Sequence, residues 1–85
     1  MKALELTKAL NASTILKDAG YVAILNDDCG LPEIIVKPEG EPRWGGFVEY
    51  LYTFAVVKLK VNYITSFQLA VLDKEIRAQA TITEF

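Results

Sequence analysis

A loop that ends in two consecutive glycines holds the residues of this chain best suited to bind a ligand or a partner. Arg43 and Trp44 directly precede Gly45 and Gly46. A glycine pair lets backbone N–H groups approach a bound anion, and an arginine can pair with the same anion. Trp44 can stack on a ring or an acyl chain. Because a lone Gly-Gly pair is a weak motif, the alternative is that the glycines only turn the chain while Trp44 covers the end of a sheet.

Glu49 and Tyr50 follow this loop, and Glu49 is the one candidate for acid–base catalysis. The chain contains no histidine, which excludes Ser-His-Asp and Cys-His catalysis and the usual zinc sites. A carboxylate with aromatic neighbours gains a raised pKa, as a general base requires. The alternative is a glutamate in the first turn of a helix, where the helix dipole favours it. Since no catalytic motif surrounds Glu49, we expect a protein that is not an enzyme.

The segment Asn26–Gly30, NDDCG, combines two aspartates with the only cysteine. Asp27 and Asp28 offer fewer oxygen ligands than calcium needs, so we interpret them as part of a solvated hairpin turn. We expect neither a metal nor a cofactor. A single cysteine excludes an internal disulfide and suits a reducing compartment, and its acidic neighbours argue against a reactive thiolate.

Charge and hydropathy argue against two classes of partner. The net charge is −2, and Lys58 and Lys60 are the closest approach to the basic stripe that nucleic acid requires. The longest apolar-rich run, residues 47–64, is interrupted by charged side chains and lacks the ~20 apolar residues of a membrane span. Glu5 and Lys8 interrupt any signal-peptide core. We therefore expect a cytoplasmic protein that contacts neither nucleic acid nor a membrane.

The size and apolar content of the chain predict self-association. Its 85 residues suit a single domain over residues 1–85. Of these residues, 52% are hydrophobic, and the mean hydropathy is +0.23. A body this small has little interior in which to bury so many apolar side chains. We therefore expect a homodimer in which a second copy covers the surplus apolar surface.

The first half of the chain predicts a helix followed by a hairpin. Leucines and alanines near 3.6-residue spacing indicate a helix over Lys2–Ala19, with a break possible at Ser13 as a second N-cap and with Gly20 ending it. Apolar strands are expected at Tyr21–Leu25 and Leu31–Lys37, joined by the NDDCG turn.

The middle of the chain predicts a short helix and a strand. Phe47–Ala55 carries apolar residues at i, i+3, i+4 and i+7, which favours a helix, although its aromatic and β-branched content favours a strand. We predict the helix. Residues 56–64 alternate between apolar and polar, which predicts a strand with one wet face formed by Lys58, Lys60 and Asn62.

The C-terminal third supports two structures. Thr65 and Gln68 have the spacing of a capping box, which predicts a helix. The alternation of Ile76, Ala78, Ala80 and Ile82 with polar residues instead favours a hairpin with the preceding segment FQLAVL. We predict the hairpin.

The segments IIVKPEGEPRWGGFVEYLYTFA, VVKLKVNYI and FQLAVLDKEIRAQATITEF, read in order, resemble parts of the hot-dog fold of acyl-thioesterases. The resemblance covers Ile34–Phe85 and implies a strand, a loop ending in Gly-Gly, a central helix and antiparallel strands. It also implies an acidic catalytic residue on the helix, where Glu49 stands. Trp44 replaces the histidine that many such enzymes carry before the glycines, and the chain is one strand short.

We therefore expect an α+β fold with an N-terminal helix, a mostly antiparallel sheet of four or five strands, and a short middle helix packed on one face. The favoured function is non-catalytic protein–protein contact or self-association. The alternative is a hot-dog-like binder or hydrolase of an acyl or anionic ligand, with contacts from Arg43, Trp44, Gly45, Gly46 and Tyr50.

Overall fold

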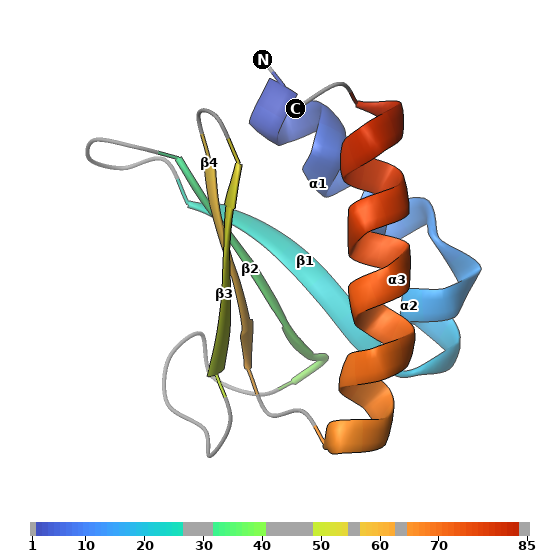
Figure 1. Ribbon diagram of the computed structural model, residues 1–85. Helices are drawn as coiled ribbons and strands as arrows, with labels where there is room; N and C mark the ends of the chain where they lie inside the picture. The colour runs from blue at the N-terminus through green and yellow to red at the C-terminus, as the bar shows by residue number, and fades with distance from the viewer. Residues whose placement is uncertain (1, 27–31, 41–48, 55–56, 63–64, 84–85) are drawn as a thin grey trace.

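The computed structural model describes residues 2–26, 32–40, 49–54, 57–62 and 65–83. Three helices and four strands follow one another along the chain (Figure 1). In chain order they are α1 (Lys2–Ala12), α2 (Thr14–Asp18), β1 (Tyr21–Asn26), β2 (Glu33–Pro38), β3 (Glu49–Phe54), β4 (Val57–Asn62) and α3 (Ser66–Ile82).

The four strands form one mixed sheet in the order β1-β2-β4-β3. The two outer pairs, β1 with β2 and β3 with β4, are antiparallel, whereas the central pair of β2 and β4 is parallel. The α+β class is as expected. The expected sheet is matched only in part, because a parallel ladder lies at its centre.

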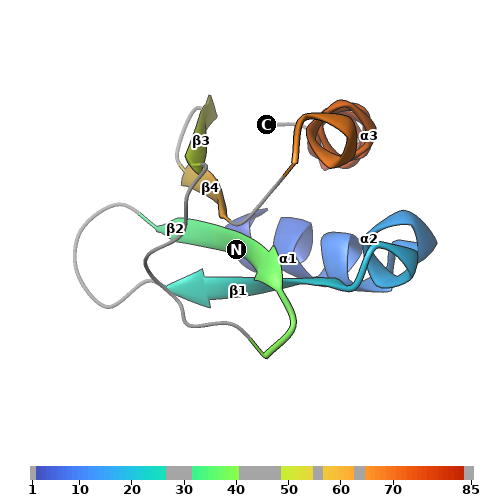
Figure 2. The ribbon, with the colours of Figure 1, turned by 90° about the horizontal axis from the view of Figure 1, so that it is seen from below.

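All three helices lie on one face of the sheet (Figure 1). Seen from below, β1 and β2 run beside α1 and α2, while β4 and β3 turn up toward α3, so the sheet bends around the helices (Figure 2). Helices α1 and α2 run in the direction opposite to α3. The result is a two-layer structure whose helical layer has an outer surface that the sheet does not cover.

The predicted N-terminal helix is divided at Ser13, as the sequence suggested. Ser13 ends the first helix by donating its N–H to the Leu10 carbonyl, and its own carbonyl accepts from Lys17, both at 3.1 Å. The second helix ends at Ala19 and is followed by Gly20, whose φ of 77° favours glycine. The Gly20 carbonyl then accepts the Glu39 N–H at 2.9 Å, which starts the ladder between β1 and β2.

The first hairpin is confirmed by the antiparallel register of β1 and β2, in which Ala23 lies opposite Val36. The turn residues Asp27, Asp28 and Cys29 lie outside the described residues. Pro32 stands just before β2, where its missing N–H costs no ladder bond. Its carbonyl accepts the Lys58 N–H at 3.0 Å and so links the start of β2 to β4.

The predicted middle helix is wrong, because Glu49–Phe54 is strand β3. It pairs along its whole length with β4, from Glu49 opposite Asn62 to Phe54 opposite Val57. The helical spacing of apolar residues in this segment was coincidental. The tyrosines, threonine and phenylalanine favour a strand, and a ready antiparallel partner follows within a few residues.

The predicted C-terminal hairpin is also wrong, because Ser66–Ile82 is helix α3. The capping box at its start is present: the Thr65 side chain accepts the Gln68 N–H, and the Gln68 side chain accepts the Thr65 N–H. The four apolar residues whose alternation suggested a strand do not share one face of the structure. Ile76 and Ala80 are buried, whereas Ala78 and Ile82 are exposed, as the period of a helix requires.

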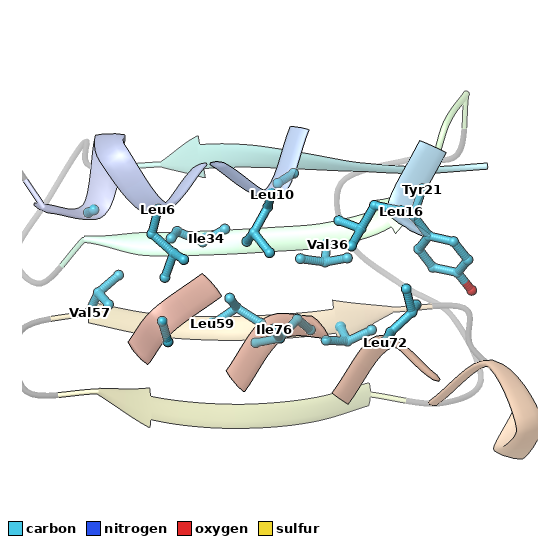
Figure 3. Packing of buried hydrophobic residues seen from close by; sticks show 14 residues of the cluster. Leu6, Leu10, Leu16, Tyr21, Ile34, Val36, Val57, Leu59, Leu72 and Ile76 are labelled. Atoms are coloured by element: carbon cyan, nitrogen blue, oxygen red, sulfur yellow. The ribbon is translucent and has the colours of Figure 1, made fainter. Parts of the chain in front are cut away.

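The core lies between the helices and the sheet (Figure 3). Leu6 and Leu10 of α1 point toward Ile34 and Val36 of β2, and Ile76 of α3 lies beside Leu59 of β4. Fully buried side chains come from all three helices and from both central strands. They include Leu6, Leu10, Leu16, Ile34, Val36, Val57, Leu59, Val61, Leu72 and Ile76.

Candidate functional site

The site predicted at the glycine pair falls mainly outside the described part of the chain. Arg43, Trp44, Gly45 and Gly46 all lie in residues 41–48, which the structure does not describe. The backbone of Glu49 and Tyr50 is described and belongs to β3, where these residues stand opposite Asn62 and Val61. Glu49 therefore does not begin a helix, and the helix on which the hot-dog resemblance depends is a strand.

The polar face predicted for β4 is only partly polar. Lys58 is exposed, but Asn62 is 4% exposed and belongs to the interior, which corrects its assignment to a wet face. Lys60 forms an ion pair with Glu33 of β2, with 3.7 Å between Nζ and Oε2. The ion pair neutralises one of the two lysines predicted to lie on this face.

The largest exposed apolar side chains that the structure describes lie on the helices. Phe67 and Ile82, near the two ends of α3, are 80% and 73% exposed, and Val71 between them is 41% exposed. Ile15 of α2 and Leu4 of α1 are each 40% exposed. A single exposed leucine is ordinary, whereas a group of exposed apolar side chains is the kind of surface that protein contacts commonly use.

An apolar groove runs between α2 and α3 beside these residues. It has a volume of about 390 Å³ and is lined by Ile15 on one side and by Ala70, Val71, Lys74, Glu75 and Ala78 on the other. A second hollow of about 250 Å³ lies next to it and shares Val71. Its other lining residues are Ala19, Phe67, Gln68 and Leu72. We call these two hollows and the exposed stripe of Phe67, Val71, Ala78 and Ile82 the helical face.

Local sequence signals position α3 beside α2. The capping box of Thr65 and Gln68 fixes the first turn of the helix, and the buried Leu72, Ile76 and Ala80 turn one side of it toward the core. The opposite side of the helix is then forced outward.

A polar contact between distant parts of the chain holds Glu75, one of the residues that line the groove. Ser13 Oγ donates to Glu75 Oε2 at 2.6 Å, across 62 residues of sequence. Glu75 Oε1 accepts from Gln79 Nε2 at 3.3 Å. Ser13 makes no side-chain cap to α2, because its hydroxyl is directed to α3 instead. The Glu75 carboxylate is therefore held in one orientation beside the groove.

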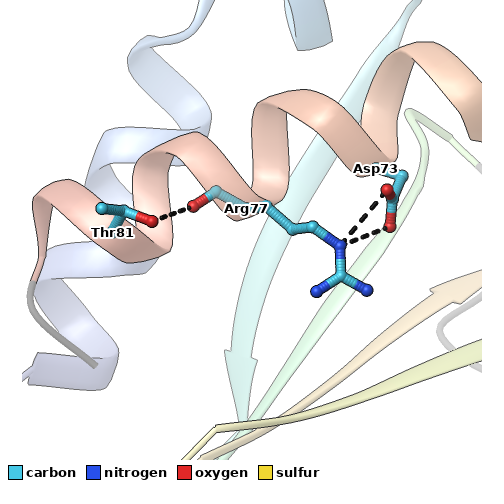
Figure 4. A network of polar contacts seen from close by, with 3 residues as sticks. All are labelled: Asp73, Arg77 and Thr81. Atoms are coloured by element: carbon cyan, nitrogen blue, oxygen red, sulfur yellow. Dashed lines mark hydrogen bonds and ion pairs between the residues drawn. The ribbon is translucent and has the colours of Figure 1, made fainter.

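The remaining charges on α3 are partly paired within the helix (Figure 4). Arg77 Nε donates to both carboxylate oxygens of Asp73, at 3.1 and 3.3 Å, and the Arg77 carbonyl accepts the Thr81 hydroxyl at 2.8 Å. These contacts flank the apolar stripe. Within the helical face itself, Lys74 and Glu75 stand side by side in the sequence with opposite charges.

One ionisable group near the second hollow has a shifted pKa. Tyr21 is buried at the start of β1, and its hydroxyl donates to Gln68 Oε1 at 3.4 Å. Burial raises the pKa of the Tyr21 phenol above its ordinary value, because the interior disfavours the phenolate. Tyr21 therefore ties α3 to the sheet as a neutral group.

Comparisons of the chain with protein families, with curated proteins and with solved structures found no match. Among the described residues, no group of three or more cysteine, aspartate or glutamate side chains is arranged to hold a metal ion. None of the helices in that part of the chain combines the length and apolarity that crossing a bilayer requires. The geometry of the helical face is therefore the ground for a functional proposal.

Sequence reasoning did not find the helical face, although a signal for it was present. Phe67, Val71 and Ala78 follow one another at intervals of four and seven residues, which fits one side of a helix. Predicting a hairpin placed these residues in two strands and concealed the stripe.

Proposed function

We propose that this protein acts by binding a polypeptide through its helical face, and not by catalysis. The observation that carries the proposal is the exposure of Phe67 and Ile82 on a helix whose other side is fully packed. Burying either side chain against a partner contributes about 1.5–3 kcal/mol to binding. A surface of this kind favours association because each large apolar side chain stays in water until a partner covers it.

The character of the groove supports a polypeptide as the bound partner. Its walls are mostly aliphatic, with one lysine and one glutamate as the charged groups. Grooves between two helices commonly accept a third helix, which presents apolar side chains at the same 3.6-residue period. The missing histidine and the absence of a catalytic motif in the sequence point in the same direction.

Quantitative affinity capture with the tagged full chain tests this proposal. We expect recovery of a polypeptide, either the chain itself or another protein, that is lost with Phe67→Ser and retained with the control Lys58→Ser. The recovered polypeptide is then purified and titrated against both variants by calorimetry. The proposal fails if no purified polypeptide, including the chain itself, binds in a way that depends on Phe67.

A further inference from the structure

We propose that the outer edge of β3 is a second polypeptide-binding site, at which an extended segment of another protein adds a strand to the sheet. This inference goes beyond the proposed function, because it concerns the sheet and does not involve the helical face. Three observations carry it: the position of β3 in the sheet, the contrast between the two edges of the sheet, and the sequence of β3 itself.

Strand β3 ends the strand order β1-β2-β4-β3 and pairs within the sheet with β4 alone. Figure 2 shows it at the opposite end of the sheet from β1. In an antiparallel pair, alternate residues direct their N–H and C=O groups to opposite sides, so every second residue of β3 directs both groups away from β4. Another extended chain has its own groups at the same spacing, and peptides join sheet edges in this way.

The other edge of the sheet is already engaged by the protein itself. At β1, the side-chain amide of Asn11 donates to the Ala23 carbonyl and accepts the Ala23 N–H, both at 2.8 Å. Helix α1 also packs against this strand. Proteins block sheet edges with such coverings because an open edge pairs with other chains. We therefore expect an added strand at β3 and not at β1.

The sequence of β3, EYLYTF, has none of the features that usually protect an edge strand. Lysines, prolines, bulges and short strands discourage edge pairing. Strand β3 contains neither lysine nor proline, and Glu49, its one charged residue, stands at its end. It is as long as the other strands, and its pairing with β4 is continuous, without a bulge. Tyrosine, threonine and phenylalanine also favour a strand. These properties suit a strand that accepts a partner.

Strand β4 indicates which kind of segment fits beside β3, because it is the strand that β3 already accepts. Its residues alternate between buried apolar side chains, at Val57, Leu59 and Val61, and polar ones, of which Lys58 is exposed. An added strand meets the same two environments, since the helices cover only one face of the sheet (Figure 1). The partner is therefore an extended segment with apolar residues at alternate positions and polar residues between them.

Helix α3 favours a single added segment over a second copy of the whole sheet. It lies on the face toward which β3 and β4 turn (Figure 2). Asp73 and Arg77 lie on the flank of α3 opposite to Glu75, which is bonded to Ser13. In Figure 4 both side chains leave α3 toward the side on which the yellow and orange strands run. A second copy would bring its own helices to this side, whereas one extended segment needs the width of a strand, about 4.8 Å.

NMR titration of the isotope-labelled full chain with a peptide tests the site. The probe is the capped peptide VKLKVN, which has the sequence of β4, and its control is the scrambled peptide VVLKKN. We expect VKLKVN to shift the backbone amides of Glu49–Phe54 and to leave that of Ala23 unchanged, and we expect VVLKKN to bind more weakly. The variant Phe67→Ser, on the helical face, should bind VKLKVN with an unchanged Kd. This control separates the site from the proposed function.

Backbone N-methylation of the peptide distinguishes strand pairing from general apolar contact. One variant is methylated at the positions of Lys58 and Lys60 and the other at those of Leu59 and Val61, so each loses the N–H donors of one side. Strand addition predicts that one variant binds about tenfold more weakly or worse, while the other stays within about threefold of the parent peptide.

Three results would overturn the inference: no shifts in β3 at millimolar peptide, shifts centred on β1 or α3, or equal Kd values for the two methylated peptides. If the titration succeeds while no polypeptide binds through Phe67, the proposed function fails and this inference stands. If a second copy of the chain pairs with β3 and the peptide does not, the site is a dimer interface and the inference is wrong.

Discussion

The side-chain amide of Asn11 pairs with the backbone of Ala23 as a neighbouring strand would. Asn11 Nδ2 donates to the Ala23 carbonyl, and Asn11 Oδ1 accepts the Ala23 N–H, both at 2.8 Å. Strand β1 lies at an edge of the sheet, where unpaired backbone groups invite pairing with other chains. A residue of α1 therefore satisfies one position of this edge and ties the helix to the sheet.

Replacing Asn11 with alanine should destabilise the fold. The change removes the hydrogen-bond partners of the partly buried N–H and C=O of Ala23. Leaving these groups unpaired lowers the free energy of unfolding by about 1–3 kcal/mol. The better helix propensity of alanine recovers about 0.5 kcal/mol of this loss. Urea unfolding measures the net change, and hydrogen exchange should show faster exchange of the Ala23 amide. Lys8→Ala, on the exposed side of α1, is the control; an equal effect from both variants would contradict the role given to Asn11.

The hydrogen bond between Ser13 and Glu75 should give a measurable coupling energy between the two side chains in a double-mutant cycle. Removing either side chain breaks a hydrogen bond between α1–α2 and α3, so Ser13→Ala and Glu75→Ala should not be additive. A double-mutant cycle measured by urea unfolding should give a coupling of about 1 kcal/mol or more. The same cycle between Ser13 and Thr81, whose hydroxyl bonds to the Arg77 carbonyl, should give a coupling near zero. Additive effects in the first cycle would show that the contact does not contribute in solution.

Truncating the two isoleucines of α3 should change the free energy of unfolding to very different extents. Ile76 is fully buried, so Ile76→Ala should lower the free energy of unfolding by about 2–5 kcal/mol. Ile82→Ala, on the exposed stripe, should change the free energy of unfolding by less than about 0.5 kcal/mol, while weakening the proposed binding of a polypeptide to the helical face. Thermal unfolding at low concentration separates the two effects. Similar losses from both variants would be expected of a hairpin, and would contradict the helix.

Tyr21 should make the fold sensitive to alkaline pH. Because burial raises the pKa of its phenol, the folded protein holds this proton more tightly than the unfolded chain does. The stability from Tyr21 is therefore complete below the ordinary tyrosine pKa of about 10 and is lost as the pH rises from there through the folded pKa. Urea unfolding between about pH 9 and pH 11 should give a steeper loss for the native chain than for Tyr21→Phe. Parallel pH profiles for the two proteins would rule out this contribution.

Sequence reasoning succeeded where local chemistry and tertiary packing agree. Gly20 ends α2 because its positive φ suits glycine, and the alternation of Val57, Leu59 and Val61 predicted β4 because all three point into the core. It failed where two periodicities coexist in one segment. Residues 76–82 alternate like a strand, but alanines fit either side of a helix, and the capping box at Thr65 decides the structure.

The candidate site was harder to predict than the fold. Arg43 and Trp44 drew attention because their side chains are chemically distinctive, and they lie outside the described residues. Phe67 and Ile82 are ordinary apolar residues, and nothing in their type marks them as exposed. Only the packing of Leu72 and Ile76 against the sheet places them outward, and that follows from tertiary structure.

The parallel pairing of β2 with β4 divides the molecule into two halves that are each continuous in sequence. One half consists of α1, α2 and the β1–β2 hairpin, and the other of the β3–β4 hairpin and α3. They meet along one seam, formed by the β2–β4 ladder and by the contacts of α3 with α1 and α2. An isolated two-stranded hairpin is at most marginally stable in water, so neither hairpin is expected to persist without the rest of the fold. Folding should therefore be limited by closure of this seam, with both halves becoming ordered together.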